Sequence, residues 1–313
     1  MAELRIGTRG SLLAKTQSQM VAEALESATP HLSTKLVAIT TTGDRIHDGP
    51  LQNAGGKGVF VKELQQALLD NRIDLAVHSA KDMPVERPAG LTIASTPRRA
   101  DPHDVWIGHA GETIQSLASG AVVGTTSLRR AAQVRAARSD VRIEPLRGNI
   151  DTRLAKVRQG TVAGTFLAKA GLDRTGLLPN DAVVLPLDEF IPAVGQGTLA
   201  LECRADDQST MAVAQMIHDA QTHAALMFER RVVAALAGDC LAPIGVLARP
   251  RNLDQPQNAG WIVRALIALP DGSEVARASL MGEQLDEPLF SLLIETLHRR
   301  GARQIMAKLA AMS

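Results

Sequence analysis

The N-terminal and central parts of the chain alternate short apolar runs with segments whose apolar residues recur at helical spacing. The apolar runs at 4–8, 36–40 and 73–77 predict β-strands, and helices are predicted after Ser11 and from 59 to about 69. Serine is a residue type that commonly caps a helix N-terminus. Strands that alternate with helices in this way are typical of an α/β sheet.

A second segment repeats this order of elements. Strands are predicted at 121–124 and 164–168, a helix follows the polar run 125–127, and another helix is predicted from about 150 to 157. Two α/β units of this kind resemble the architecture of type II periplasmic binding proteins. We therefore expect two doubly wound domains.

The C-terminal part has a different pattern. A helix at 224–236 precedes predicted strands at 245–248, 261–268 and 274–280, and Pro270-Asp271-Gly272 is a typical turn between the last two. Residues at the spacing of one helix face follow, namely Leu289, Leu292, Leu293, Thr296 and Leu297. These elements predict a small α+β domain with a three-stranded antiparallel sheet and a closing helix that runs to Leu309.

The predicted fold class is therefore α/β, with two doubly wound domains and a C-terminal α+β domain. A chain of 313 residues is long enough for two or three cores. We expect domain 1 to comprise residues 1–97 and 198–216, domain 2 residues 98–197, and domain 3 residues 217–313. The active site is expected in a cleft between domains 1 and 2, with a loop of domain 3 reaching into it.

Composition and charge narrow the function. Hydrophobic residues make up 45% of the chain and charged residues 21%, which is ordinary for a soluble globular protein. A net charge of +1 argues against a general binder of polyanions. Aromatic residues at 2%, with no Tyr, argue against binding of single-stranded nucleic acid by base stacking. We expect no nucleic-acid partner.

The chain carries no pattern typical of a secreted protein, a membrane protein or a metalloprotein. The first residues lack the basic and apolar regions of a secretory signal, and no apolar stretch approaches the length of a membrane span. Cys203 and Cys240 do not suggest a disulfide framework, and the histidines have no metal-site spacing. We expect a cytoplasmic protein with no membrane partner and no metal.

Cationic side chains recur where a predicted strand turns into a helix. Helix N-termini bind anions through unpaired N–H groups, and arginine pairs with carboxylates through two parallel hydrogen bonds. These positions are Arg9 beside Ser11, Lys57, Arg129 with Arg130, and Arg147 with Arg153. A single surface arginine is usually solvated or in a weak salt bridge. Their recurrence nevertheless predicts a site for a polycarboxylate or a phosphate.

Asp82 and Cys240 are the candidate reactive groups. Asp82 follows a buried-looking strand, where sites open in α/β sheets, and it can stabilise a cation and move a proton beside Lys81. Its alternative role is to cap the turn before Pro84. Cys240 lies on a loop, where a thiolate can add to an electrophilic carbon and form a thioether. A lone cysteine is more often a small buried residue, an interpretation that suits Cys203.

Several segments, taken together, closely resemble the porphobilinogen deaminase family. They occur in family order and are Thr8-Arg9-Gly10-Ser11, residues 55–64 (GGKGVFVKEL), 77–86 (VHSAKDMPVE), 124–130 (GTTSLRR), 146–149 (LRGN), 192–197 (PAVGQG), and Cys240 with Pro243-Ile244-Gly245. The rest of the C-terminal part matches only in general pattern.

The resemblance implies a stepwise transferase reaction. In this family four porphobilinogen molecules are joined head to tail with loss of ammonia, and water releases the linear tetrapyrrole hydroxymethylbilane, a precursor in heme biosynthesis. The family carries one dipyrromethane cofactor per chain, attached by a thioether to the cysteine that matches Cys240. The catalytic aspartate of the family matches Asp82. By the same resemblance we expect a monomer.

The resemblance also implies binding residues. Cofactor-binding positions of the family match Ser11, Asp44, Lys81, Thr125, Ser127, Arg129, Arg130, Arg147 and Arg153. Substrate-binding positions match Arg9, Ser11, Lys57, Phe60, Arg147, Arg153 and Gln196. Because each pyrrole carries an acetate and a propionate, a growing chain accumulates negative charge, which is consistent with so many arginines.

Four residues depart from the family pattern. Asp239 stands where Gly usually precedes the cysteine, Thr42 replaces a frequent Arg, Asn53 a frequent Lys, and Asp173 a common Lys. Each change weakens local positive charge, and none removes a core catalytic position.

The sequence leaves two other functions open. A non-catalytic solute-binding protein shares the two-lobed fold, but such proteins are exported, and the third domain with Cys240 has no role in them. An arginine-rich regulator or nucleic-acid binder is disfavoured by the nearly neutral net charge.

Overall fold

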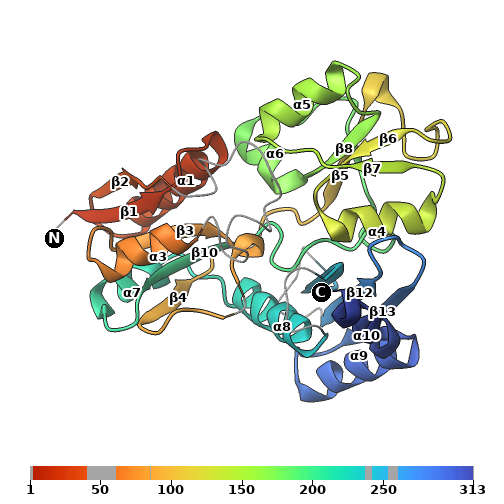
Figure 1. Cartoon of the computed structure of the whole chain (residues 1–313). Coiled ribbons are helices and arrows are strands. Elements are labelled where there is room, and N and C mark those ends of the chain that lie inside the picture. The colour runs from red at the N-terminus through yellow and green to blue at the C-terminus, as the bar shows by residue number, and fades with distance from the viewer. Residues whose placement is uncertain (1–2, 41–60, 85, 237–241, 253–259, 313) are drawn as a thin grey trace. The chain divides into compact units, whose positions relative to one another are not determined.

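Two compact units make up the fold of this chain. The computed structural model describes residues 3–40, 61–84, 86–236, 242–252 and 260–312. Unit 1 comprises Met1–Ala100, Arg174–Gly176 and Gly197–His223, and unit 2 comprises Asp101–Asp173, Leu177–Gln196 and Ala224–Ser313. Figure 1 labels the elements of both units. The division into three domains stays a prediction.

Unit 1 contains a five-stranded sheet with the strand order β2-β1-β3-β10-β4. Its strands are β1 (Leu4–Thr8), β2 (Thr34–Ala38), β3 (Leu75–Ser79), β4 (Leu91–Ser95) and β10 (Leu199–Arg204). Its helices are α1 (Leu12–Ala28), α3 (Lys62–Leu69), α7 (Gln208–Gln215) and the short 3-10 helix η2 (Ala80–Asp82). β1 pairs in parallel with β2 and β3, whereas β10 runs antiparallel between β3 and β4.

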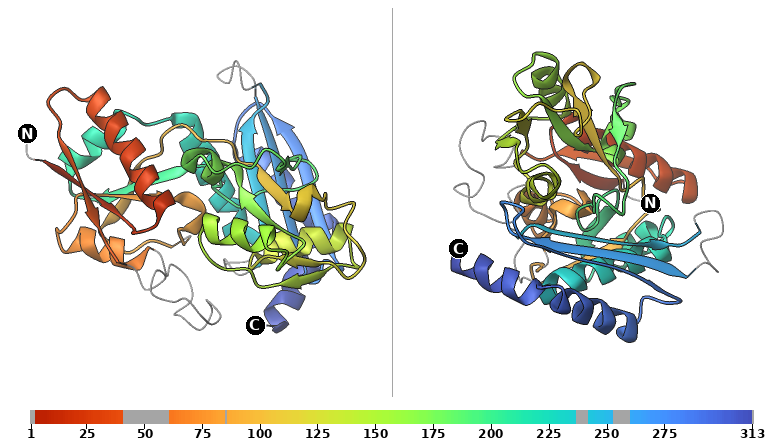
Figure 2. Two further views of the ribbon diagram at one scale, coloured as in Figure 1. Left: turned by 90° about the horizontal axis from the view of Figure 1, so that it is seen from above. Right: turned by 90° about the vertical axis from the view of Figure 1, so that its right-hand side faces the viewer.

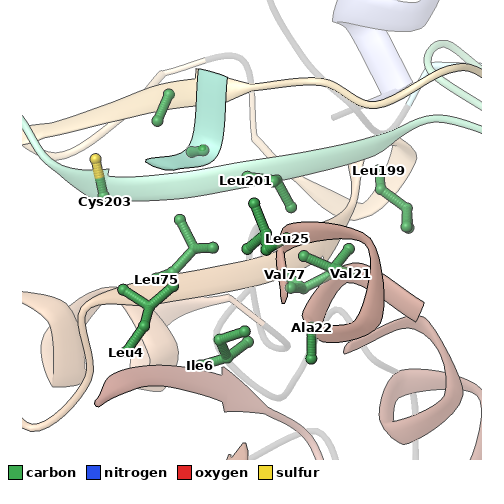
Figure 3. Close-up of a cluster of buried hydrophobic side chains, with 12 residues drawn as sticks. Leu4, Ile6, Val21, Ala22, Leu25, Leu75, Val77, Leu199, Leu201 and Cys203 are labelled. Carbon is green, nitrogen blue, oxygen red and sulfur yellow. The ribbon is translucent and has the colours of Figure 1, made fainter. Parts of the chain in front are cut away.

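Helices cover both faces of this sheet because its central strands are apolar on both sides. Leu75 and Val77 of β3 belong to the cluster that Leu25 of α1 completes. Ala76, which lies between them and points the other way, belongs to the cluster that Leu68 of α3 completes. Figure 3 shows the first of these clusters. Unit 1 is therefore doubly wound, as the sequence predicts.

Cys203 belongs to the cluster on the α1 side of the sheet. Its side chain lies on β10 among apolar neighbours and is fully buried (Figure 3). Burial raises the pKa of the thiol to about 11, and the nearby carboxylate of Asp207 adds to the rise. A thiol with such a pKa stays protonated at neutral pH. The interpretation of Cys203 as a small buried residue is confirmed.

The strand β10 is not predicted by the hydrophobic pattern, because a carboxylate interrupts it. Glu202 is fully buried in the middle of the strand. Its Oε2 lies 3.0 Å from Nε2 of His78, and the amide nitrogen of Gln65 donates to both of its oxygens. These partners lie far from Glu202 in the sequence. Only the folded chain brings these partners to the carboxyl group, so a local pattern gives no sign of the strand.

Asp74 holds two arginines where β3 begins. Its carboxylate accepts hydrogen bonds from Nε and Nη2 of Arg5, at 2.9 and 2.7 Å, and from Nη2 of Arg204 at 3.2 Å. Partial burial raises the pKa of Asp74, but these hydrogen bonds outweigh burial and bring the pKa below its ordinary value. The group therefore stabilises the fold while it is ionised.

We expect Asp74→Asn to lower the free energy of unfolding by about 1–3 kcal/mol at neutral pH, because it removes charge-assisted hydrogen bonds. Solvent screens the partly exposed Arg5, so the lower part of that range applies. A depressed carboxyl pKa gives stability that is present above the unfolded-state pKa and is lost as the pH falls through the folded-state pKa. Urea unfolding of both proteins should therefore show a difference at pH 7 that closes in acid. A difference that grows in acid would contradict this assignment.

Unit 2 contains a second five-stranded sheet, with the strand order β7-β6-β8-β5-β9. Its strands are β5 (Asp104–Gly108), β6 (Val122–Gly124), β7 (Arg142–Glu144), β8 (Gly164–Ala168) and β9 (Val183–Val184). Its helices are α4 (Leu128–Ala137), α5 (Ile150–Arg158) and the short 3-10 helix η3 (His109–Gly111). Two further helices, α6 (Lys169–Thr175) and α8 (Ala220–Leu236), have residues in both units.

The second sheet is also covered on both faces. Trp106 of β5 and Phe166 of β8 pack with Val134 of α4. Val105, the neighbour of Trp106 in the strand, packs instead with Leu154 of α5. Figure 1 shows α4 and α5 on opposite sides of the sheet. The α/β fold class is thus confirmed for both five-stranded sheets.

The C-terminal part of unit 2 forms a three-stranded antiparallel sheet in the order β11-β12-β13. Its elements are β11 (Ile244–Pro250), β12 (Trp261–Ala268), β13 (Val275–Gly282), α9 (Glu287–Arg299) and α10 (Ala302–Met312). Both helices pack against one face of the sheet (Figure 2). The predicted sheet and the predicted turn at 270–272 are confirmed, whereas the closing helical segment is two helices separated by Arg300 and Gly301. That Gly301 has a φ of 100° explains the break, because this conformation favours glycine.

The turn between β12 and β13 is attached to α4. Nη1 of Arg135 donates to the carbonyl of Pro270 at 3.0 Å, and a Cβ at Gly272 would lie 2.6 Å from the backbone nitrogen of Ala136. Only glycine permits this approach. The small sheet therefore supports the helix whose first turn contains Arg129 and Arg130.

No helix within the described part of the chain has the length and apolar character that membrane crossing requires.

Candidate active site

In unit 1 four of the predicted site residues lie at one edge of the sheet. β1 and β3 are parallel neighbours, so both strands end at the same edge. Arg9 and Ser11 follow β1, and Lys81 and Asp82 follow β3. The parallel pairing therefore brings together residues that are far apart in the sequence.

Asp82 is held outside the core by its own neighbours. It ends the short helix η2, in which Ala80 is buried and donates its backbone N–H to the carbonyl of Thr198 at 3.0 Å. Met83, the next residue, is buried as well. The side chains of Lys81 and Asp82 are exposed between these two anchors. The backbone of Asp82 is thus fixed while its carboxylate is accessible.

Ser11 and Ser79 connect this edge to α1. Ser11 is the N-cap of α1, and its Oγ accepts the backbone N–H of Ala14 at 3.3 Å. The amide nitrogen of Gln17, one turn further along α1, donates to Oγ of Ser79 at the end of β3, at 3.1 Å. The N-terminus of α1 is therefore tied to the turn that carries Asp82.

In unit 2 the candidate residues also gather at one edge of a sheet. β6 and β8 are parallel, so Gly124 and Ala168 end at the same edge. β5 is antiparallel to β8, and its first residue Asp104 pairs with Ala168. Asp104 therefore begins its strand where β6 and β8 end.

The polar run after β6 caps α4 as the sequence predicts. The backbone N–H of Ser127 donates to Oγ1 of Thr125 at 3.1 Å, and Oγ of Ser127 accepts the backbone N–H of Arg130 at 3.4 Å. This cap places Arg129 and Arg130 in the first turn of the helix, beside Asp104.

Arg129 and Arg130 are buried and share the carboxylate of Asp104. Nη1 of Arg129 donates to Oδ2 of Asp104 and to the carbonyl of Ile191, each at 2.7 Å. Nε and Nη2 of Arg130 donate to Oδ1 of Asp104 at 3.0 and 2.6 Å, and its Nη1 donates to the carbonyl of Phe166 at 2.8 Å. Asp104 is fully buried, and the two arginines are 5% and 7% exposed.

The charges in this cluster shift one another. Burial by itself raises the pKa of Asp104, but the charges of Arg129 and Arg130 outweigh burial and hold that pKa well below its ordinary value. Burial lowers the pKa of Arg129, an effect that Asp104 opposes and the like charge of Arg130 reinforces. An additional anion beside Arg129 would therefore stabilise its charged form.

Gln196 and Glu229 hold the loop at 192–197. Gln196 is buried, and its amide nitrogen donates to the carbonyl of Pro102 at 2.8 Å and to Oδ1 of Asp104 at 3.1 Å. Glu229 of α8 is fully buried, and it accepts the backbone N–H of Gly195 at 2.7 Å and that of Ala248 at 2.9 Å. Within unit 2 the loop is thus connected both to α8 and to the carboxylate that holds the arginines.

The other predicted residues of unit 2 lie around α5 and α6. Arg147 precedes α5 and is half-buried, and Nε of the half-buried Arg153 donates to the carbonyl of Gly148 at 2.9 Å. Asp173, where the family commonly has Lys, pairs with Lys169 at 2.7 Å. The negative charge that Asp173 introduces is therefore paired with the positive charge of Lys169 in the same helix.

Several predicted residues lie outside the described residues. They are Cys240, Asp44, Lys57 and Phe60, together with the departures Asp239, Thr42 and Asn53. Among the residues that the structure describes, no cluster of His, Cys, Asp or Glu has the arrangement of a metal site.

Asp104 and Glu229 are site residues that sequence reasoning missed. The signal for Asp104 was a carboxylate that directly precedes the apolar run Val105-Trp106-Ile107. A charge at the start of a fully buried strand requires a buried partner. The adjacent arginines at 129 and 130 are that partner, but their pairing with Asp104 is long-range.

Comparisons with known proteins give one family. The profile described as porphobilinogen deaminase, dipyrromethane cofactor binding domain, matches residues 4–212. The porphobilinogen deaminase of Brevibacillus brevis is 42% identical over 310 residues, which is 98% of each chain. That of Sorangium cellulosum is 46% identical over 276 residues, which is 88% of this chain and 90% of the other.

Solved structures of similar fold include two ligand-binding proteins. The Escherichia coli periplasmic aliphatic sulphonate binding protein SsuA has a TM-score of 0.42 and 15% identity, over 75% of this chain and 70% of that one. The ligand-binding component of an ABC-type import system from Staphylococcus aureus has a TM-score of 0.40 and 14% identity, over 74% and 73%.

Proposed function

Because the chain belongs to the porphobilinogen deaminase family, we propose that Asp82 and Cys240 carry the chemistry of that family in this protein. The activity is that of a transferase, hydroxymethylbilane synthase: four porphobilinogen molecules are condensed with loss of ammonia, and the linear tetrapyrrole is released by water. The cofactor is dipyrromethane. The solute-binding and regulatory alternatives are thereby replaced by an enzyme of tetrapyrrole biosynthesis.

The observation that supports these site assignments best is the arginine pair at the start of α4. A dipyrromethane carries carboxylates on both rings, so its site requires fixed positive charge. Arg129 and Arg130 are held in one orientation by Asp104, and their combined charge exceeds that of the single carboxylate they share. The donor groups therefore fit an acidic pyrrole chain. Arg147, Arg153, Thr125 and Ser127 at the same sheet edge are proposed to complete the cofactor site.

The edge of unit 1 has the groups that the reaction needs at the pyrrole ring. Asp82 is an accessible carboxylate on a fixed turn, with Lys81 beside it. We assign to Asp82 the stabilisation of positive charge on the reacting pyrrole and the removal of the proton after the new carbon–carbon bond forms. Arg9, Ser11 and Lys81 are assigned to the carboxylates of cofactor and substrate.

The remaining assignments rest on family membership and the sequence. Cys240 is proposed to hold the cofactor through a thioether, which supplies a covalent primer for chain growth. Asp44, Lys57, Phe60 and Gln196 are proposed to contribute to cofactor or substrate binding. We propose a cytoplasmic monomer that acts on porphobilinogen and has no nucleic-acid or membrane partner.

Intact-protein mass spectrometry of the purified enzyme tests the cofactor assignment. We expect a mass above that of the sequence by two pyrrole units, with the excess on the peptide that contains Cys240. The denatured protein should give the colour of pyrroles with an acidic aldehyde reagent. Active protein with the unmodified mass would contradict the proposal, and so would an excess mass on the peptide that contains Cys203.

A further inference from the structure

Unit 2 buries more positive than negative charge at the start of α4. The two guanidinium groups of Arg129 and Arg130 are almost completely buried, and the one carboxylate that bonds to them among the described residues is that of Asp104. Buried charges are costly unless they are paired and hydrogen-bonded. The cluster is therefore better suited to a state in which a second anion is present.

The hydrogen bonds divide the two arginines into different roles. Arg130 is fully engaged along the Nε–Nη2 edge of its guanidinium, because both nitrogens donate to Oδ1 of Asp104. Arg129 is held only through Nη1, by Asp104 and by the carbonyl of Ile191. Its Nε and Nη2 have no hydrogen-bond partner among the residues that the structure describes. These two nitrogens form the edge that pairs with a carboxylate through two parallel hydrogen bonds.

We propose that Asp104 is a positioning residue for the reaction: it engages Arg130 as a brace and holds Arg129 so that the Nε–Nη2 edge of Arg129 receives a carboxylate of the pyrrole chain. The inference rests on the proposed function. The two adjacent arginines, which belong to one sequence motif, thus have different roles. Arg130 anchors Asp104, and Arg129 binds the carboxylate.

Asp104 is itself fixed from several sides. It starts β5 in register with the end of β8, which places it at the sheet edge where α4 begins. The amide nitrogen of Gln196 gives its Oδ1 a further donor at 3.1 Å. Its low pKa keeps it ionised throughout the physiological range. A permanently charged carboxylate with this many donors can hold a guanidinium plane in a single orientation.

Asp74 offers a matched control for this role. It is also a carboxylate that accepts from two arginines, Arg5 and Arg204. It precedes β3, however, whereas Asp82 follows that strand, so Asp74 lies at the opposite edge of its sheet from the candidate site. Asp74→Asn therefore makes the same chemical change at a less buried carboxylate, and so disturbs an arginine pair without the loss of positioning.

The test compares Asp104→Asn with Asp74→Asn in purified full-length enzyme. Three properties of each variant are measured. Intact mass gives the fraction of chains that carry dipyrromethane, kinetics with porphobilinogen give kcat and KM, and urea unfolding gives the unfolding midpoint. We expect both variants to lose stability. Only Asp104→Asn should show incomplete loading or a fall of kcat/KM in the loaded fraction by about 100-fold, the scale of a misplaced binding group. Full loading together with a kcat/KM within about twofold of the Asp74→Asn enzyme would overturn the proposal.

A second pair of variants applies if Asp104→Asn does not fold. Arg130→Lys keeps the charge but loses the two-nitrogen edge, and Arg5→Lys makes the same change at Asp74. We expect a fall in loading or in kcat/KM for Arg130→Lys alone, and equal values for the two variants would refute a bracing role. The wild-type enzyme is assayed first: failure to consume porphobilinogen would refute the proposed function, whereas an active wild type with equivalent variants would refute only the role of Asp104.

Discussion

Replacement of Cys240 by serine is expected to abolish tetrapyrrole synthesis. A thiolate is the nucleophile that forms a thioether, and a thiol ionises far more readily than a serine hydroxyl. The variant should therefore accumulate without its primer. We expect a mass equal to that of the sequence, no colour with the aldehyde reagent for pyrroles, and a turnover reduced by at least about 1000-fold, as for the loss of other covalent nucleophiles.

Cys203→Ser is the matched control for this substitution. Cys203 is fully buried in the core of unit 1, where its thiol has a raised pKa, and its Sγ lies 3.2 Å from the carbonyl of Arg204, which a serine hydroxyl can also reach. We expect this variant to lose some stability and to keep both its cofactor and its turnover. Synthesis of tetrapyrrole at the wild-type rate by Cys240→Ser would remove the covalent primer from the mechanism.

The elements that the sequence predicts best are those whose pattern is complete within a few residues. The strands at 4–8 and 261–268 are found with the predicted bounds, because each is a compact apolar run between polar or turn residues. The caps at Ser11 and Ser127 are local hydrogen bonds and are found as predicted. The predicted strand at 36–40 begins two residues earlier, at Thr34, because its pairing with β1 extends to Leu4.

The parts that could not be predicted depend on partners distant in the sequence. Glu202 interrupts the apolar run of β10, and its hydrogen-bond partners in the core, His78 and Gln65, are distant in the sequence. Asp104 similarly marks the start of β5, and its partners are Arg129 and Arg130 on another element. Composition and spacing identify these residues as charged, but only the three-dimensional fold decides which charges are paired.

In the candidate site, too, the sequence predicts the features that depend on neighbouring residues and not those that depend on distant partners. The motif around Asp82 predicts an accessible carboxylate after a buried strand, and the structure describes such a group. The arginine motif predicts carboxylate ligands at both Arg129 and Arg130. The hydrogen bonds differ, because Arg129 donates to Asp104 through Nη1, whereas Arg130 donates to it through Nε and Nη2. A motif therefore locates the site, but the buried carboxylate that distinguishes its members lies outside the motif.

Asp82→Glu is expected to reduce turnover by about 100-fold or more while the cofactor stays attached. The substitution keeps the carboxylate but moves it by about one methylene, and a charge placed to stabilise a developing cation loses most of its effect when it is displaced. The fold should tolerate the change, because Asp82 is exposed and the anchors of its turn, Ala80 and Met83, are unaltered. Turnover of porphobilinogen, intact mass and the unfolding midpoint are measured on the same preparation.

Asp70→Glu gives the same chemical change at an exposed position of unit 1, in the connection between α3 and β3 and thus at the other end of the strand from Asp82. We expect it to leave turnover within about twofold of wild type, as is usual for surface substitutions. Asp82→Asn should be slower than wild type as well, because an amide cannot balance the positive charge of the reacting ring. If Asp82→Glu and Asp70→Glu had equal turnover, Asp82 would only cap its turn. Another group would then have to stabilise the positive charge on the reacting pyrrole and remove the proton after the new carbon–carbon bond forms.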